Sequence, residues 1–245
     1  MEKIVALVVT ILCAFAYPLP AQTSFERDTV KTSAGDLTIT FIGHATLMFS
    51  CGGKTIHVDP WSKLADYSKL PKADIVLITH DHFDHLDRDA LKQATNEQSI
   101  VILTRGCKQE GATGIVMNNG DVKSIGAITI EAVHAYNIIN KRSDGQPFHP
   151  KGDGNGYIIA FGDKKVYVAG DTENTPEMKK LRGIDIAFLP MNLPYTMTTE
   201  MAAEAAKALM PKILYPYHFG ETDTAKLITL LRGFPAIDVR IRKMQ

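Results

Sequence analysis

The sequence predicts a mixed α/β protein in which two mixed β-sheets pack face to face and helices cover both outer sides, an α/β/β/α sandwich. Three observations support this: short apolar runs recur along the chain, helical patterns lie between and after them, and one hairpin pattern occurs twice. The chain has 245 residues and no Pro- or Ser-rich linker. One domain with a large core is therefore expected.

The first residues have the pattern of an export signal. Lys3 precedes the apolar run 4–16, and small residues allow cleavage after Ala21 or, alternatively, after Ala16. We therefore expect a signal peptide at 1–21, a single domain at 22–245 and export to the bacterial periplasm. A membrane anchor is the competing interpretation, but the thirteen apolar residues are fewer than the roughly 20 that a spanning helix needs.

The strands and helices are expected where the apolar pattern changes its period. Ten short runs rich in Val, Ile, Tyr and Phe are typical of strands. They are 37–42, 46–50, 55–59, 74–79, 99–104, 127–133, 156–161, 165–169, 184–189 and 212–217. Helical patterns occupy 87–94, 175–183, 198–211 and 222–233. The second of these has a Thr cap, a Pro in the first turn and a Gly at its end.

One hairpin pattern occurs twice. "TLMFSCGGKTIHVDP" (46–60) and "GYIIAFGDKKVYVAGDT" (156–172) each contain an apolar strand, a Gly-led turn, a Lys, a second apolar strand and a final aspartate. The repeat indicates two related halves, each with its own sheet, although chance similarity between two hairpins is the alternative. Each hairpin would place an aspartate, Asp59 or Asp171, at a strand end.

The overall composition argues against nucleic-acid and membrane partners. Lys plus Arg equals Asp plus Glu at 27 each, and the pI is about 7.1, so the chain has no general attraction for polyanions. Small molecules are the expected partners. Cys51 and Cys107 either form a disulfide or are simply buried, and their spacing does not decide between the two.

A dense cluster of histidines and aspartates follows the run 74–79. The stretch "THDHFDHLD" contains three of the eight histidines. In an extended segment His80 and His82 point the same way and can bind one ion, while Asp84 and His85 face a second. A polar loop that leads into a helix is the alternative, with Asp87 as the helix cap. Three imidazoles this close would repel one another when protonated, which favours a metal site.

Three further candidate ligands lie at the ends of apolar runs. His134, Asp171 and His218 each follow a predicted strand. Gly170 lets the backbone approach closely beside Asp171, whose carboxylate could bridge two ions. Each of these residues alone is more often structural, but together with the cluster they favour metal ligation.

At this point the chain resembles the metallo-β-lactamase superfamily. Its H-x-H-x-D-H motif and its later His, Asp and His occur here in the same order. The resemblance implies the four-layer sandwich already expected from the repeated hairpin. It also implies a ligand set: a first ion held by His80, His82 and His134, a second held by Asp84, His85 and His218, and Asp171 as the bridge.

A closer resemblance is to the branch with ascorbate-6-phosphate lactonase-like hydrolases and phospholipase D-like enzymes that act on N-acylphosphatidylethanolamine. It rests on "FIGHATLMF" with His44, on "HVDPW" and on "FHPKGDGNGY". It implies one or two divalent ions, with zinc as the first choice and manganese as the second. Asp59 matches an aspartate that supports the ligands without binding metal.

The chemistry implied is hydrolysis. A divalent ion can supply hydroxide at neutral pH, which would attack an ester, a lactone or a phosphodiester. Asp84 and Asp171 would hold the nucleophile and its proton, and His44 would contact the substrate or orient a ligand. A metal-holding protein that binds a ligand without catalysis is the rival hypothesis.

Substrate selection is expected from the segment 136–155, which has no strand or helix pattern. His149 and Lys151 lie there among glycines and could bind a phosphate or carboxylate, with Tyr195 as a further candidate. A flexible surface loop is the alternative.

Overall fold

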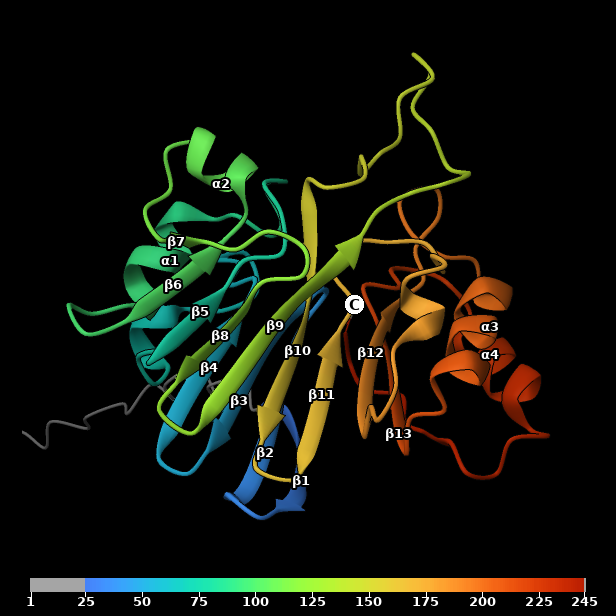
Figure 1. Ribbon diagram of the computed structural model, residues 1–245, viewed down its shortest axis with the longest axis horizontal. Helices are drawn as coiled ribbons and strands as arrows, with labels where there is room; N and C mark the ends of the chain where they lie inside the picture. The colour runs from blue at the N-terminus through green and yellow to red at the C-terminus, as the bar shows by residue number, and fades with distance from the viewer. Residues whose placement is uncertain (1–24, 245) are drawn as a thin grey trace, which may run out of the picture.

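The computed structural model describes residues 25–244, which form an α/β sandwich (Figure 1). Two seven-stranded sheets pack together in this part of the chain. Helices α1 and α2 lie outside the first sheet, and α3 and α4 lie outside the second. The predicted fold class is therefore confirmed. The predicted signal peptide at 1–21 lies outside the described residues, and within 25–244 every helix is too short to cross a bilayer.

The two sheets have the same topology. Each has four consecutive antiparallel strands followed by three parallel ones, in the order of the chain. The first contains β1 (Glu26–Thr32), β2 (Gly35–Gly43), β3 (Thr46–Cys51), β4 (Lys54–Val58), β5 (Ile75–Leu77), β6 (Ile100–Leu103) and β7 (Ile115–Val116). The second contains β8 (Val122–Ile125), β9 (Ile128–Ala135), β10 (Gly154–Phe161), β11 (Lys164–Val168), β12 (Ile186–Pro190), β13 (Ile213–Tyr217) and β14 (Asp238–Val239).

The repeated hairpin is confirmed. The pair β3–β4 and the pair β10–β11 are both antiparallel hairpins, and each is central to its own sheet. Gly52 and Gly53 have φ of 56° and 75°, the left-handed conformation that this tight turn requires. Asp59 and Asp171 consequently lie at equivalent places, just after the fourth strand of each half.

The main core lies between the sheets. Aromatic rings from both sheets meet there, with ring centroids 5.9 Å apart for Phe49 and Phe188. Alternation along β5 explains the layers: Ile75 and Leu77 pack in this core, whereas Val76 packs in a separate cluster with α2. Cys51 and Cys107 do not form a disulfide. Both are buried free thiols, which is the second of the two possibilities that the sequence left open.

Three of the four predicted helices form. They are α1 (Arg88–Ala94), α3 (Thr199–Leu209) and α4 (Thr224–Leu231), and the short α2 (Arg105–Gln109) and the 3₁₀ turn Tyr67–Lys69 are additional. Asp87 caps α1 as anticipated, through hydrogen bonds from the first turn. The predicted helix at 175–183 was wrong: only the 3₁₀ turn Met178–Lys180 forms, because Pro176 and Gly183 leave too few residues between them for a stable α-helix.

Asp28 links β1 to the C-terminal segment and supports one stability prediction. Burial raises the pKa of Asp28, but hydrogen bonds from Tyr215, Arg242 and Arg240 outweigh burial and lower it. Asp28→Ala is expected to lower the free energy of unfolding by about 2–3 kcal/mol, because two guanidinium groups lose a largely buried partner. Urea denaturation measures this. The exposed Asp36→Ala should change stability by less than about 0.5 kcal/mol, and equal effects would contradict the prediction.

Candidate metal centre

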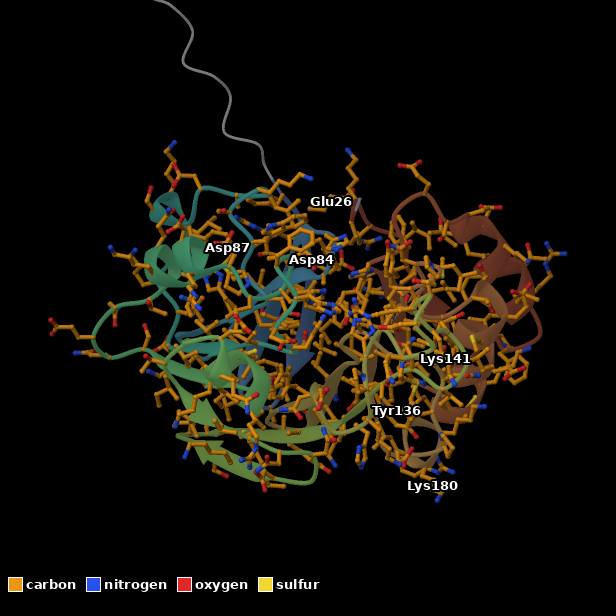
Figure 2. All side chains as sticks on the ribbon, turned by 90° about the horizontal axis from the view of Figure 1, so that it is seen from above. Glu26, Asp84, Asp87, Tyr136, Lys141 and Lys180 are labelled. Carbon is orange, nitrogen blue, oxygen red and sulfur yellow. The ribbon has the colours of Figure 1, made fainter. Side chains whose placement is uncertain are left out.

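The candidate site lies where strands from both halves end at one edge of the sandwich. His80 and His82 follow β5, Asp171 follows β11 and His218 follows β13. Figure 2 looks onto the molecule from above and shows Asp84 near the middle, between the two halves of the chain. The topology therefore brings residues more than 130 positions apart into one cluster.

The first group of ligand atoms comes from His80, His82 and His149. His82 Nδ1 lies 3.2 Å from His149 Nε2. His149 Nδ1 lies 2.7 Å from the side-chain oxygen of Asn137, so this nitrogen carries the proton and Nε2 is a bare lone pair. His80 Nδ1 contacts the Thr79 hydroxyl at 3.0 Å, which likewise leaves His80 Nε2 available.

The second group comes from His44, Asp84, His85 and His218. His44 Nε2 lies 2.9 Å from Asp84 Oδ2. Asp171 lies between the two groups: its Oδ2 is 3.3 Å from His218 Nε2 and 3.4 Å from His149 Nε2. One buried carboxylate is thus within reach of nitrogen atoms from both groups, as a bridging ligand would be.

These residues fit divalent ions. His80 Nε2, His85 Nε2, His218 Nε2 and Asp171 Oδ1 are buried side-chain atoms without a hydrogen-bond partner, which is costly unless another partner satisfies them. They all belong to the candidate ligand groups. Imidazole and carboxylate donors suit zinc and manganese alike.

The geometry favours a different third histidine for the first group. His134, the predicted ligand, still lies within β9, opposite Asn155 on β10, and it lines a separate small cavity with Glu177. It belongs to none of the candidate ligand groups found within residues 25–244. His149, predicted to bind substrate, lies with His80 and His82 instead. Both histidines flank the same segment, and the rule that ligands follow strands selects His134, whereas the geometry favours His149.

His149 is held by a structured arm. Residues 137–149, here called the arm, fold back on themselves: Asn137 N donates to His149 O at 2.9 Å, and Lys141 pairs with Pro147. The buried Glu173 carboxylate holds the base of the arm, accepting hydrogen bonds from the backbone N–H groups of residues 138, 139 and 140 at 2.9, 2.8 and 2.7 Å. Figure 1 shows the arm projecting beyond the ends of β9 and β10.

Asp59 supports the ligands from behind. Its Oδ2 lies 2.8 Å from His85 Nδ1 and accepts from the Thr79 hydroxyl at 2.7 Å. A carboxylate on Nδ1 fixes the ring and directs Nε2 into the site. The position agrees with the role implied by the resemblance, a support that does not itself bind metal.

The backbone is strained at several of these residues. His44, Asp59 and His218 have φ of 49°, 44° and 45°, a left-handed conformation that costs a non-glycine residue about 1 kcal/mol or more. His218 N donates to His44 O at 2.8 Å, and His44 N donates to Met244 O at 3.0 Å. These bonds hold the strained residues, and strain of this kind is typical of functional sites.

The cluster divides its protons unevenly. Burial lowers the pKa of His149 to about 4, and burial also holds the pKa of His80 well below its usual value. Burial acts in the same direction on His85, but Asp171 and Asp59 outweigh it and raise its pKa to about 9. The neighbouring carboxylates therefore favour a positive charge at His85. A metal ion that binds there must displace the proton.

A pocket of about 660 Å³ opens directly above the cluster. His44, Asp84, Asp171 and the predicted substrate residue Tyr195 line it. Lys151, the other predicted substrate residue, does not: its ammonium pairs with Glu177 outside this pocket. The sequence did not single out several further lining residues, among them Trp61, Lys63, Arg142 and Phe148.

The fold and the site together define a protein of the metallo-β-lactamase superfamily. Residues 38–218 match the family model of the beta-lactamase superfamily domain. The chain belongs, more narrowly, to the UPF0173 metal-dependent hydrolase family. A member from Koribacter versatilis is 34% identical over 199 residues, which cover 75% of this chain and 84% of that protein.

Solved structures agree with this membership. A structure from Parabacteroides distasonis, described as that of a metal-dependent hydrolase, is 48% identical, covers 90% of this chain and 100% of its own, and has a TM-score of 0.86. Igni18, described as a metallo hydrolase from Ignicoccus hospitalis, is 28% identical with a TM-score of 0.70 and coverages of 85% and 96%.

Proposed function

We propose that this protein is an exported hydrolase that cleaves an ester, lactone or phosphodiester bond in a small molecule, using one or two divalent ions. The observation that carries the proposal is the position of Asp171, within 3.4 Å of imidazole nitrogens from both ligand groups at the base of an open pocket. A protein that only bound a ligand would have no need for this open cluster.

Bound at this cluster, a divalent ion would acidify a coordinated water and polarise the bond to be cleaved. The chain's own residues would then position the reactants. Asp84 has one oxygen held by His44, and burial raises its pKa, but His218, His44 and His85 together lower it well below the usual range. It would therefore stay ionised and accept a hydrogen bond from the attacking water.

His44 would act on the pocket side of Asp84. Its ring lies close to that of His218 and tilted against it, with centroids 3.9 Å apart, and it lines the pocket. From there Nε2 donates to the Asp84 carboxylate and would hold it in place beside the substrate. Asp171 would orient ligands from both groups.

The branch, the location and the partners belong to the same proposal. The "GHAT" and "FHPKG" stretches support a likeness to lactonase-like and phospholipase D-like hydrolases. The amino-terminal pattern supports export to the periplasm. The balanced charge supports a small-molecule substrate over a nucleic acid.

Metal analysis combined with chelation tests the proposal. Protein starting at Gln22 and purified without chelator is expected to contain one or two ions per chain by plasma mass spectrometry. Chelation should abolish hydrolysis across a panel of esters, lactones and phosphodiesters, and zinc or manganese should restore it. Bound metal without hydrolysis on the whole panel would favour the non-catalytic binding protein instead.

A further inference from the structure

The pocket above the metal cluster carries two cations that lack carboxylate partners. Lys63 and Arg142 both line it, and among residues 25–244 neither forms an ion pair. The lining carboxylates, Asp84 and Asp171, are already engaged by histidines. One divalent ion would balance those two carboxylates, so the two cations would leave the pocket with an excess of positive charge.

Each cation lies over an aromatic ring at the rim of the pocket. The Lys63 ammonium is 5.0 Å from the centre of the Trp61 ring, and the Arg142 guanidinium is 5.4 Å from that of Phe148. Phe148 in turn packs edge-on against Tyr195 at 5.1 Å. The pocket thus offers flat apolar surfaces beside positive charge, a combination that suits an anion with an apolar or aromatic body.

Arg142 is bound to a candidate metal ligand. Its Nη2 lies 3.2 Å from His82 Nε2 and 3.2 Å from Phe148 O. A guanidinium can only donate, so His82 Nε2 must accept and His82 Nδ1 must carry the proton. That proton points at the bare Nε2 of His149 at 3.2 Å, and His149 donates from Nδ1 to Asn137 at 2.7 Å. The proton positions are therefore consistent through the whole series of hydrogen bonds, from Arg142 to Asn137.

A metal ion bound in the first group would interrupt this series of hydrogen bonds at His82. The His82 atom that faces the group is Nδ1, and a neutral imidazole that binds metal through Nδ1 carries its proton on Nε2. Nε2 could then no longer accept from Arg142. The guanidinium would keep its hydrogen bond to Phe148 O and turn its remaining donors toward the pocket.

We propose that Arg142 binds an oxyanion, a carboxylate or phosphate, on an apolar substrate, and that metal binding at His82 releases it for this role. The proposal rests on the proposed hydrolase function, for which it names the substrate class. Arg fits both oxyanions because its planar fork makes two parallel hydrogen bonds. The anion would fix the scissile bond over Asp171, with the apolar body between Trp61 and Phe148.

Ligand binding can be followed without turnover, because Trp61 is the only tryptophan of the chain and lines the pocket. Zinc-loaded protein is titrated with phenylacetate, with phenylphosphonate and with uncharged phenylacetamide while Trp fluorescence is recorded. We expect both anions to bind at least about tenfold more tightly than the amide. Stronger binding of one anion identifies the preferred oxyanion.

Variants distinguish anion binding by Arg142 from anion binding by the metal ion. Arg142→Gln should lower the affinity for both anions at least about tenfold and the affinity for the amide less than about twofold. Arg142→Lys should recover part of the lost affinity. Arg182→Gln is the control, because it removes an exposed arginine that donates to nearby backbone carbonyls. In metal-free protein the effect of Arg142→Gln should fall below about threefold. Anion binding that is unchanged in Arg142→Gln, or weakened equally without metal, would overturn the proposal.

The proposed function can fail separately. If the ester, lactone and phosphodiester panel yields no metal-dependent hydrolysis while the fluorescence differences hold, the protein binds amphipathic anions without cleaving them. If hydrolysis occurs but Arg142→Gln slows neutral and anionic esters equally, the hydrolase function stands and the substrate class is wrong.

Discussion

His149→Ala is expected to lower the affinity of the first ion by more than about 100-fold, beyond the 10–100-fold typical of residues that only orient a ligand. The variant removes one of three nitrogen donors from the group with His80 and His82. Metal-dependent hydrolysis should fall with it, because a site with two imidazoles neither retains its ion nor positions it. Metal content and competition with a chromogenic chelator measure the effect.

His134→Ala is the matched control. Both histidines flank the same segment of chain, but His134 lies in β9 outside the candidate ligand groups. Its replacement should leave metal content and affinity within about twofold of the wild type. If His134→Ala lost the ion and His149→Ala kept it, the ligand set drawn from the structure would be wrong and the one implied by the resemblance would be right.

Glu173→Gln is expected to lower the free energy of unfolding by about 2–4 kcal/mol. Glu173 is fully buried, and its two oxygens accept from three backbone N–H groups and, at 3.3 Å, from the Asn137 amide. A glutamine would turn an NH₂ group toward donors that have no other acceptor in the arm. Urea denaturation measures the loss of stability.

The same variant should also weaken metal binding about 10–100-fold. Asn137 links Glu173 to His149, since its oxygen accepts from the His149 ring and from the His149 N–H at 2.9 Å. Glu177→Gln is the control, because this carboxylate is partly exposed and pairs with Lys151 at the surface, where ion pairs contribute less than about 1 kcal/mol. A loss of stability in Glu173→Gln with unchanged metal affinity would show that the arm does not position His149.

The sequence predicted the sheets better than the arm for a physical reason. Strands and hairpins follow from local patterns such as the alternation in β5 and the glycines between β3 and β4, so both related halves could be recognised. Four strands, β1, β7, β8 and β14, lie outside the predicted runs. β7, β8 and β14 have only two to four residues and carry almost no periodic signal, and β1 (ERDTVKT) contains a single apolar residue. Candidate ligands on loops just after strands, such as His80 and His218, follow from the same local patterns.

The third histidine and the substrate residues could not be predicted in this way. The arm has no regular pattern, and its shape depends on Glu173, which is 24 residues after His149 in the sequence. Lys151 lies near a glycine-rich stretch typical of anion binding, but its partner Glu177 is contributed by a turn beyond β11. Arg142 was overlooked because an arginine in a loop is ordinary, and only the structure places it against His82.

The shared topology of the two sheets has a consequence for how this enzyme class could diversify. His44 and His149 occupy equivalent connections, one between the second and third strands and the other between β9 and β10. The first connection is only residues 44–45, whereas the second contains the whole arm. The segment that we propose to contact substrate is therefore extra length in one half, held at its base by Glu173. Exchanging residues 138–148 among relatives would change selectivity while leaving the ligand-bearing frame in place.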